Sequence, residues 1–410
     1  MAISDTLSSI SNNITNAYSA INDKGGTIPA NKNIENLASA IDTISAGGGS
    51  SEYEIITRTI TEFVDSSSAY SIIGDGAFMG CSSLSSISFP VCKNIGNFAF
   101  QSCYNLAVAN FPSCVSIGTN AFQYCSSLTT ALFPSCTTVG KSAFYFCSNL
   151  TAISFPVCTS IEYSAFVRCS SLTTVNFPSC TTVGLYAFSD CFRLTAISFP
   201  VCTSIGANAF KNCYALTSAI FPSCTSIEVG AFSSCYALTT VSFPVCTRIE
   251  NSAFFGCSSL TTVNFPSATM ISSKAFMSCI ALTTATFPSC SAIGSGAFQY
   301  CSVLSNISFP LCQIIWNAAF GYCSSLSTAS FPSCTSIYTQ AFLSCSRLRS
   351  LYLMGSSFVT LGASAAFQNT PMSNSTYLGT FGSIYVPSSM LASYKTRTNW
   401  TYYSNRLVGI

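Results

Sequence analysis

The sequence predicts a solenoid, a fold in which one short unit is stacked many times along the chain. An Ala-Phe pair recurs every 22 residues, with its phenylalanine running from Phe78 to Phe342. A Phe-Pro pair has the same period, with its phenylalanine running from Phe89 to Phe331. All 24 cysteines fall in two columns of this period, one of thirteen members and one of eleven. We therefore expect a solenoid of 13 rungs over residues 77–348.

The unit itself suggests its local structure, and Ala165–Tyr186 (AFVRCSSLTTVNFPSCTTVGLY) shows it cleanly. Leu172–Phe177 alternates apolar and small polar residues and predicts a strand, which Pro178 ends because proline has no N–H to donate. Thr181–Val183 predicts a second short strand, and Ala165–Cys169 a helical turn. One unit has too few apolar side chains to fold alone, so neighbouring units must complete its core and pair its short parallel strands.

Three units carry a resemblance to a known family: CSSLTTVNFPSCTTVG, CSNLTAISFPVCTSIE and CYALTTVSFPVCTRIE. They resemble the leucine-rich repeats of BspA-like proteins, which are found widely in bacterial surface adhesins and in phage-encoded proteins. The resemblance covers about residues 70–350 and implies a leucine-rich-repeat solenoid. It implies recognition without naming a ligand, because members of the family bind many things. The second cysteine column departs from the pattern, since such repeats more often carry a polar or aliphatic residue there.

Residues 1–46 predict a helical oligomerisation or docking module that precedes the solenoid. Apolar residues form a heptad seam, followed by a second helical pattern, and we expect self-association through residues 3–44. The seam is Ile3, Leu7, Ile10, Ile14, Ala17 and Ile21, and the second pattern is Ile34, Leu37, Ile41 and Ile44. A helical hairpin that folds on itself is the alternative. The stretch INDKGGTIPANKNIENLASAIDTI also resembles N-terminal segments of tail-associated proteins from phages of Gram-positive hosts.

Three further segments complete the predicted organisation. Residues 47–51 (GGGSS) form a Gly/Ser linker by composition, and residues 52–76, with the alternating stretch YEIITRTITEFV, predict an N-terminal cap. Residues 349–410 predict a C-terminal cap with a strand at Ile384–Val386 and a short helix from Ser388. This last segment resembles the cap that closes BspA-like repeats. A cap is needed because an open solenoid end exposes strand edges and core.

The composition argues against several classes of partner. Only 7% of residues are charged and the net charge is +2, without a basic patch, so we expect no nucleic-acid binding. No apolar run approaches the ~20 residues of a spanning helix, so we expect no membrane insertion. The first residues, MAISDTLSSISNN, lack the features of a Sec signal peptide. A phage virion protein leaves by cell lysis and needs none, so we expect a virion location, with the bacterial cell surface or extracellular space as the alternative.

The cysteines predict buried free thiols that act as small hydrophobic residues. Pairing between the two columns would leave members over, because Ala268 stands where the shorter column requires a cysteine. Pairing along one column would require inward, parallel side chains to reach disulfide geometry. The chain contains no histidine, and an eleven-residue cysteine spacing fits no common zinc module. We therefore expect neither a metal site nor a cofactor.

No residues suggest catalysis. Without histidine there is no His-based activation of a nucleophile, and no phosphate-binding glycine loop is present. Glu228 and Glu250 share a column one rung apart, but they would lie on a flat repeat surface. We therefore assign no catalytic residue and expect that the protein is not an enzyme. One column of the strand face is threonine throughout, and such arrays are mostly solvated strand surface: Thr151, Thr173, Thr195, Thr217, Thr239, Thr261 and Thr283.

The positions that vary between units predict the binding surface. Several of them carry large aromatic residues, which serve protein or carbohydrate recognition when exposed; the alternative is that they half-pack against neighbouring rungs. The candidates are Tyr124, Tyr145, Tyr163, Tyr186, Tyr300, Trp316, Tyr322 and Tyr338. We expect a non-enzymatic structural and recognition protein, associated with a phage virion or tail, that binds a host surface or other virion proteins. A bacterial cell-surface adhesin is the alternative.

Overall fold

The computed structural model describes residues 61–64, 70–373 and 381–410. They form two compact units, which are treated separately below. Unit 1 contains the described residues up to Cys180 together with Asp190–Phe192, and unit 2 contains Thr181–Ser189 and Arg193–Ile410. The predicted helical module 1–46 and linker 47–51 lie outside the described residues, as do parts of the predicted N-terminal cap.

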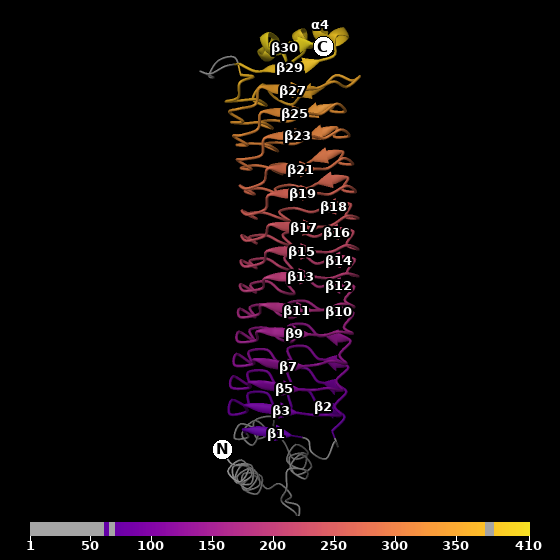
Figure 1. The fold of residues 1–410 in the computed structure, drawn as a ribbon, viewed down its shortest axis with the longest axis vertical. Helices are drawn as coiled ribbons and strands as arrows, with labels where there is room; N and C mark the ends of the chain where they lie inside the picture. Colours follow the sequence, from indigo (N-terminus) through magenta and orange to yellow (C-terminus); the bar gives the residue numbers. More distant parts are fainter. Residues whose placement is uncertain (1–60, 65–69, 374–380) are drawn as a thin grey trace, which may run out of the picture. The chain divides into compact units, whose positions relative to one another are not determined.

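Each rung contributes one three-residue strand and one two-residue strand, which Figure 1 shows as two stacks in each unit. Unit 1 holds β1 (Glu62–Val64), β2 (Ile72–Ile73), β3 (Ser86–Ser88), β4 (Asn94–Ile95), β5 (Val108–Asn110), β6 (Ser116–Ile117), β7 (Thr130–Leu132), β8 (Thr138–Val139), β9 (Ala152–Ser154), β10 (Ser160–Ile161) and β11 (Thr174–Asn176). Unit 2 begins with β12 (Thr182–Val183), β13 (Ala196–Ser198), β14 (Ser204–Ile205), β15 (Ser218–Ile220), β16 (Ser226–Ile227), β17 (Thr240–Ser242), β18 (Arg248–Ile249), β19 (Thr262–Asn264) and β20 (Met270–Ile271). It continues with β21 (Thr284–Thr286), β22 (Ala292–Ile293), β23 (Asn306–Ser308), β24 (Ile314–Ile315), β25 (Thr328–Ser330), β26 (Ser336–Ile337), β27 (Ser350–Tyr352) and β28 (Thr360–Leu361).

The strands pair in parallel with the same residue of the next rung, as the sequence predicts. Ile205 of β14 is the register partner of Ile227 in β16, exactly one repeat later, and both side chains are buried. Within unit 2 the two-residue strands form one continuous series from β12 to β28. The three-residue strands are interrupted, between β7 and β9 in unit 1 and twice in unit 2, after β17 and after β21. The two-residue strands are therefore the more continuous of the two faces.

The prediction of a helical turn at each Ala-Phe pair is wrong. In the rung around Phe210 the N–H groups of Asn208, Phe210 and Asn212 donate to carbonyls of the next rung, at 2.8–2.9 Å. The intervening Lys211 N–H closes a tight turn onto the Asn208 carbonyl. Asn208 and Asn212 have φ of 54° and 61°, in the left-handed region. Every second N–H group therefore donates to the neighbouring rung and not to a carbonyl of its own rung. The segment forms consecutive turns where a helical turn was predicted.

The core is built from stacked phenylalanine rings. Phe210 is fully buried, and its ring stacks on Phe188 and Phe232 at centroid distances of 5.4 and 5.3 Å with interplanar angles of 4° and 7°. Phe199 and Phe221, from the Phe-Pro column, meet the same ring at a tilt, at 6.0 Å. Each ring therefore touches its own column in parallel and the second column at an angle, and both are favourable aromatic geometries.

All 24 cysteines are buried and unlinked, in the two predicted columns. In the longer column, from Cys103 to Cys345, the thiol donates to the carbonyl of a phenylalanine 25 residues earlier, as Cys235 does to Phe210 at 3.1 Å. In the shorter column the thiol donates to the carbonyl two residues later, as Cys246 does to Arg248 at 3.2 Å. The cysteines are thus more than small hydrophobic residues, because they also satisfy backbone carbonyls inside the core.

The rungs extend beyond residues 77–348, so the predicted number of 13 is too low. β1 and β2 precede that range, and β27 and β28 both follow it. The spacing stretches at this end, because Leu361 of β28 pairs with Ile337, 24 residues earlier, and Phe367 stacks on Phe342 at 5.5 Å. Apolar residues at irregular spacing therefore continue the columns after the strict period ends.

The C-terminal segment closes unit 2 with a strand and short helices. β29 (Ser383–Val386) pairs with β27 and β30 (Leu407–Gly409), and between them lie η1 (Ser388–Met390), α4 (Leu391–Thr396) and η2 (Thr401–Arg406). These agree with the strand predicted at Ile384–Val386 and the helix predicted from Ser388. The buried Trp400 donates its indole N–H to the Val359 carbonyl at 2.7 Å, and the Tyr394 hydroxyl accepts from the Val359 N–H at 3.0 Å.

Candidate recognition surface

The predicted aromatic residues lie in the turns and just after the two-residue strands. Tyr124, Tyr300 and Tyr322 each stand two residues after the Ala-Phe phenylalanine, at φ of 62–65°. Their left-handed backbone turns the side chain away from the core, and all three are exposed. Trp316 and Tyr338 directly follow β24 and β26, one rung apart. In each case the buried phenylalanine and cysteine columns hold the backbone of the rung, so the position of the aromatic residue is fixed.

Unit 2 brings four of the predicted residues together as two stacked pairs. Tyr300 and Tyr322 stack at 4.8 Å with an interplanar angle of 15°. Trp316 and Tyr338 stack at 4.4 Å with an angle of 19°. Each ring of a pair therefore covers one face of its partner from the neighbouring rung; Tyr300, Tyr322 and Trp316 remain exposed, and Tyr338 is half-buried.

Unit 1 contains a smaller aromatic group. Tyr124 meets the half-buried Tyr145 edge-on at 5.7 Å, and both contact Phe146, over whose ring the Arg168 guanidinium lies at 4.9 Å. Tyr163 is exposed, with the Lys141 ammonium 5.1 Å from its ring centre. Tyr186, in unit 2, is half-buried. These residues are spread over several rungs, and the two hollows described below do not include them.

Sequence reasoning missed a third stacked pair in unit 2. Tyr214 and Tyr236 stack at 5.2 Å with an angle of 14°, and both are exposed. They stand directly after Cys213 and Cys235 in the repeated motif CYALT, so a tyrosine recurring one period apart was the available signal.

The described surface includes two hollows that lie along the repeats. One, of about 200 Å³, lies beside Trp316 in unit 2 and includes Gly294, Ser272, Ser273 and Asn251 among its lining residues. The other, of about 670 Å³, follows strands β5, β7, β9 and β11 of unit 1, across the interruption between β7 and β9. Only the first includes a residue of the predicted binding surface.

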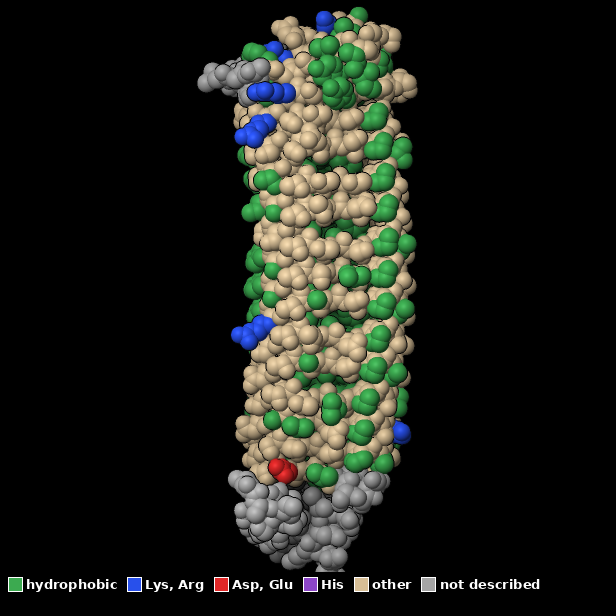
Figure 2. Space-filling model, in the orientation of Figure 1, with side chains coloured by type: hydrophobic (Ala, Val, Ile, Leu, Met, Phe, Trp, Pro, Cys, Tyr) green, Lys and Arg blue, Asp and Glu red, His purple; other side chains and the backbone are tan. Residues whose placement is uncertain are grey.

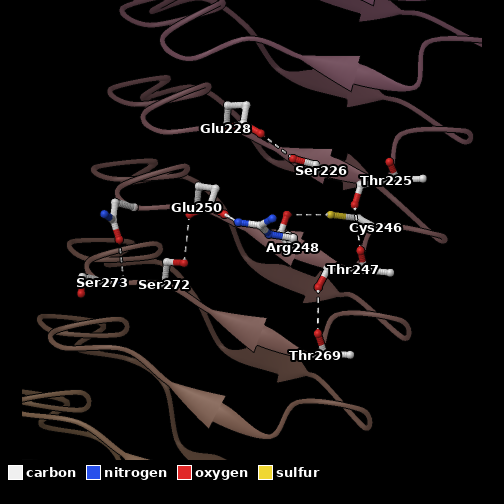
Figure 3. A network of polar contacts seen from close by, with 11 residues as sticks. Thr225, Ser226, Glu228, Cys246, Thr247, Arg248, Glu250, Thr269, Ser272 and Ser273 are labelled. Atoms are coloured by element: carbon white, nitrogen blue, oxygen red, sulfur yellow. Dashed lines mark hydrogen bonds and ion pairs between the residues drawn. The ribbon is translucent and has the colours of Figure 1, made fainter.

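A polar network runs along unit 2 toward the first hollow (Figure 3). Glu228 accepts from the Ser226 hydroxyl at 2.7 Å, while Glu250 accepts from Arg248 at 2.5 Å and from the Ser272 hydroxyl at 3.4 Å. Each carboxylate is thus bound by its own partners, and these contacts hold Ser272 in place at the edge of the hollow.

The threonine column of the strand face is engaged in the stack itself. Thr217, Thr239 and Thr283 donate their hydroxyls to the backbone carbonyls of the threonines one rung earlier, at 2.9–3.1 Å. These hydroxyls are therefore used inside the protein and are not all available to an external ligand. Charged side chains are sparse on the face of the described residues that Figure 2 shows.

A comparison with protein families matches the BspA type leucine rich repeat region at residues 56–173, 159–280 and 269–388. These ranges span more than half of the chain. The chain belongs to the BspA type leucine-rich-repeat family. The resemblance predicted from the repeats is thereby confirmed, whereas residues 21–44, which resemble phage tail-associated proteins, lie outside the matched ranges. A comparison with curated proteins found no match.

The chain is similar to several solved structures, and the first of these, with a TM-score above 0.5, shows the same fold. A leucine-rich repeat protein from Bacteroides ovatus is 24% identical, with 83% of this chain and 87% of that chain covered and a TM-score of 0.55. A leucine rich cell surface protein from Faecalibacterium prausnitzii is 25% identical over 71% and 87% of the two chains, with a TM-score of 0.40. A leucine-rich repeat protein from Eubacterium ventriosum is 18% identical over 79% and 86%, with a TM-score of 0.39. In the described residues no helix is long and apolar enough to cross a bilayer.

Proposed function

We propose that this protein is a non-enzymatic recognition protein that binds a protein or carbohydrate on a cell surface through the exposed aromatic side chains of its turns. The observation that carries the proposal is the pairing of these rings in unit 2. Tyr322 is stacked on Tyr300, and Trp316 on Tyr338, yet Trp316 and Tyr322 are each 39% exposed. A ring that is already fixed loses little conformational freedom on binding, and aromatic anchors of this kind dominate binding energies.

Two settings are compatible with this function. The first is a bacterial cell-surface or extracellular adhesin, because proteins of the BspA type family are typically found at the cell surface or outside the cell. A phage virion or tail-associated protein rests on the resemblance of residues 21–44. Immunogold labelling of intact bacteria and protein mass spectrometry of purified virions separate the two, because the adhesin is expected only in the first preparation and the virion protein only in the second.

Binding of the purified protein to a panel of bacterial and host cells tests the function. The wild-type chain is expected to bind at least one cell type saturably, and Trp316→Ala combined with Tyr322→Ala is expected to weaken this binding at least tenfold. Val245→Ala, which removes an exposed apolar side chain outside the aromatic pairs, serves as the matched control and should bind normally. Equal binding by all three proteins would contradict the proposal.

A further inference from the structure

The hollow beside Trp316 has an indole ring on one side and a glycine, Gly294, among its other lining residues. Trp316 stands one rung after Gly294, and both line the hollow. A side chain at Gly294 would place its Cβ 2.6 Å from the Ser272 carbonyl carbon and the Ser273 nitrogen, so no side chain fits at this position. Met270, Ile271 and Ala292 complete the lining. Tyr338 stacks on Trp316 from the following rung. Because Tyr338 and Gly294 lie on opposite sides of Trp316 along the stack, the indole face away from Tyr338 is the one turned toward the hollow.

The polar groups at the rim are small, neutral and fixed. Ser272, Ser273, Ser295 and Asn251 line the hollow, and its lining contains no ionisable side chain. Asn251 accepts the Ser273 N–H on its side-chain oxygen at 3.0 Å, which orients its amide nitrogen as a donor. The Ser272 hydroxyl is held by Glu250 (Figure 3). The Ser272 oxygen is thus left to accept and the Asn251 amide nitrogen to donate, and Ser273 and Ser295 lie in the same lining, next to a flat apolar wall.

This chemistry matches one sugar ring better than a peptide. A peptide that adds to a sheet needs a strand edge with unpaired N–H and C=O groups. Here β22 lies between β20 and β24 and pairs with both, so it offers no edge. A volume of about 200 Å³ suits a single ring, and a neutral lining suits an uncharged one. The apolar C–H face of a pyranose fits against an aromatic ring, while its hydroxyls match a polar rim.

We propose that the hollow formed by Trp316, Gly294, Ser272, Ser273 and Asn251 binds a neutral pyranose unit of a surface glycan. This inference rests on the proposed recognition function and names its ligand class. The indole covers one face of the sugar, and the serine hydroxyls and the asparagine amide hold its ring hydroxyls. A single hollow of this size binds weakly, so repeated sugars on a cell surface supply the avidity.

Tryptophan fluorescence reports on this site directly. The chain has two tryptophans, and Trp400 is only 1% exposed with its indole N–H bonded inside the C-terminal segment. A ligand at the surface therefore changes mainly the emission of Trp316. We screen the wild-type protein on an array of neutral glycans together with uronic acid analogues, and then titrate it with the methyl glycoside of the terminal sugar of each bound glycan. A saturable change in emission is expected, and the uronic acid analogue should bind no better.

Variants assign the binding to the hollow. Trp316→Ala is expected to weaken glycoside binding at least tenfold by saturation-transfer NMR, and Trp316→Phe, which keeps a flat ring, should weaken it less. Val245→Ala removes an exposed apolar side chain that does not line the hollow and serves as the control, with unchanged binding expected. Thermal unfolding of each variant verifies that it is folded.

The outcomes separate this inference from the function on which it rests. Absence of binding across the glycan array overturns the sugar site, and so does glycoside binding that Trp316→Ala leaves unchanged. If no glycan binds but Trp316→Ala still abolishes cell binding, the ligand is a protein and the recognition function stands. If cell binding is also insensitive to both Trp316 and Tyr322, the two proposals fail together.

Discussion

Away from the column ends, each inward phenylalanine lies between two rings of its own column, which makes the core intolerant of a missing side chain. Phe210 has Phe188 and Phe232 at about one rung spacing on either side, and all three are completely buried. The two neighbours are fixed by the hydrogen bonds of their own rungs, so they cannot move together to fill a gap. Packing defects therefore stay open in this fold.

Phe210→Ala is expected to lower the free energy of unfolding by about 3–5 kcal/mol, because it removes buried surface and leaves a cavity that cannot collapse. Urea denaturation measures the change. Tyr236→Ala, which truncates an aromatic that is 49% exposed, is the control and should change stability by less than about 1 kcal/mol. An unchanged midpoint for Phe210→Ala would mean that this column is not packed as the structure shows.

The elements are organised by turns whose hydrogen bonds alternate between the rung and its neighbour. In almost every rung of the regular repeat, two residues adopt the left-handed region, one before the Ala-Phe pair and one two residues after its phenylalanine. Glycine occupies the first of these positions in some rungs, as at Gly296 (φ 63°), and a residue with a side chain in others, as at Lys274 (φ 57°). Residues other than glycine pay an energetic cost for this backbone conformation.

Lys274→Gly is therefore expected to stabilise the protein by about 1 kcal/mol, since glycine relieves the left-handed strain. The neighbouring Ser273 has no such backbone, so Ser273→Gly should destabilise by about 0.5–1 kcal/mol. Paired denaturation curves measure the difference. If both glycines destabilised equally, the left-handed turn would not be the strained element.

The sequence predicts the strands well and the turns poorly, for a physical reason. Leu172–Phe177 shows the two-residue alternation of a half-buried strand, and β11 lies within it. The segment Ala165–Cys169 was expected to form a helical turn, but the left-handed residues Ser164, just before it, and Arg168, within it, carry no common signal of their conformation. The same limit applies to the binding surface. Trp316 could be predicted because its position varies between repeats. The hollow beside it also depends on Gly294, which the sequence does not distinguish from glycines at the same position of other repeats.

At the scale of the whole molecule, the buried thiols lower the free energy of unfolding when the pH becomes alkaline. Burial raises the pKa of Cys202, Cys246 and Cys290 from an ordinary value of 9.0 to about 11. The folded chain thus favours the protonated thiol. Stability from these groups is complete below pH 9 and is lost as the pH rises from 9 toward 11, by about 1.4 kcal/mol per pH unit for each group.

Urea midpoints measured in reducing buffer at pH 7, 9 and 10.5 are expected to be similar at the first two values and clearly lower at the third. Cys246→Ala removes one titrating group, so its midpoint should fall less steeply between pH 9 and 10.5 than that of the wild-type chain. A midpoint that stayed constant to pH 10.5 would contradict the raised thiol pKa values.

The N-terminal residues carry the last prediction, which concerns assembly. The seam from Ile3 to Ile21 is short and polar outside its apolar stripe, so it needs a partner to be stable, and Ile at most seam positions favours trimers or larger bundles. We expect the predicted Gly/Ser linker 47–51 to transmit little packing energy from the repeats. We therefore expect the full chain to be oligomeric, and a chain that begins at Ser51 to be monomeric and folded.

Multi-angle light scattering and circular dichroism on both proteins measure this. Two monomers would favour the helical hairpin, and a shortened chain that unfolds would mean that residues 1–46 act as a cap for the first rung.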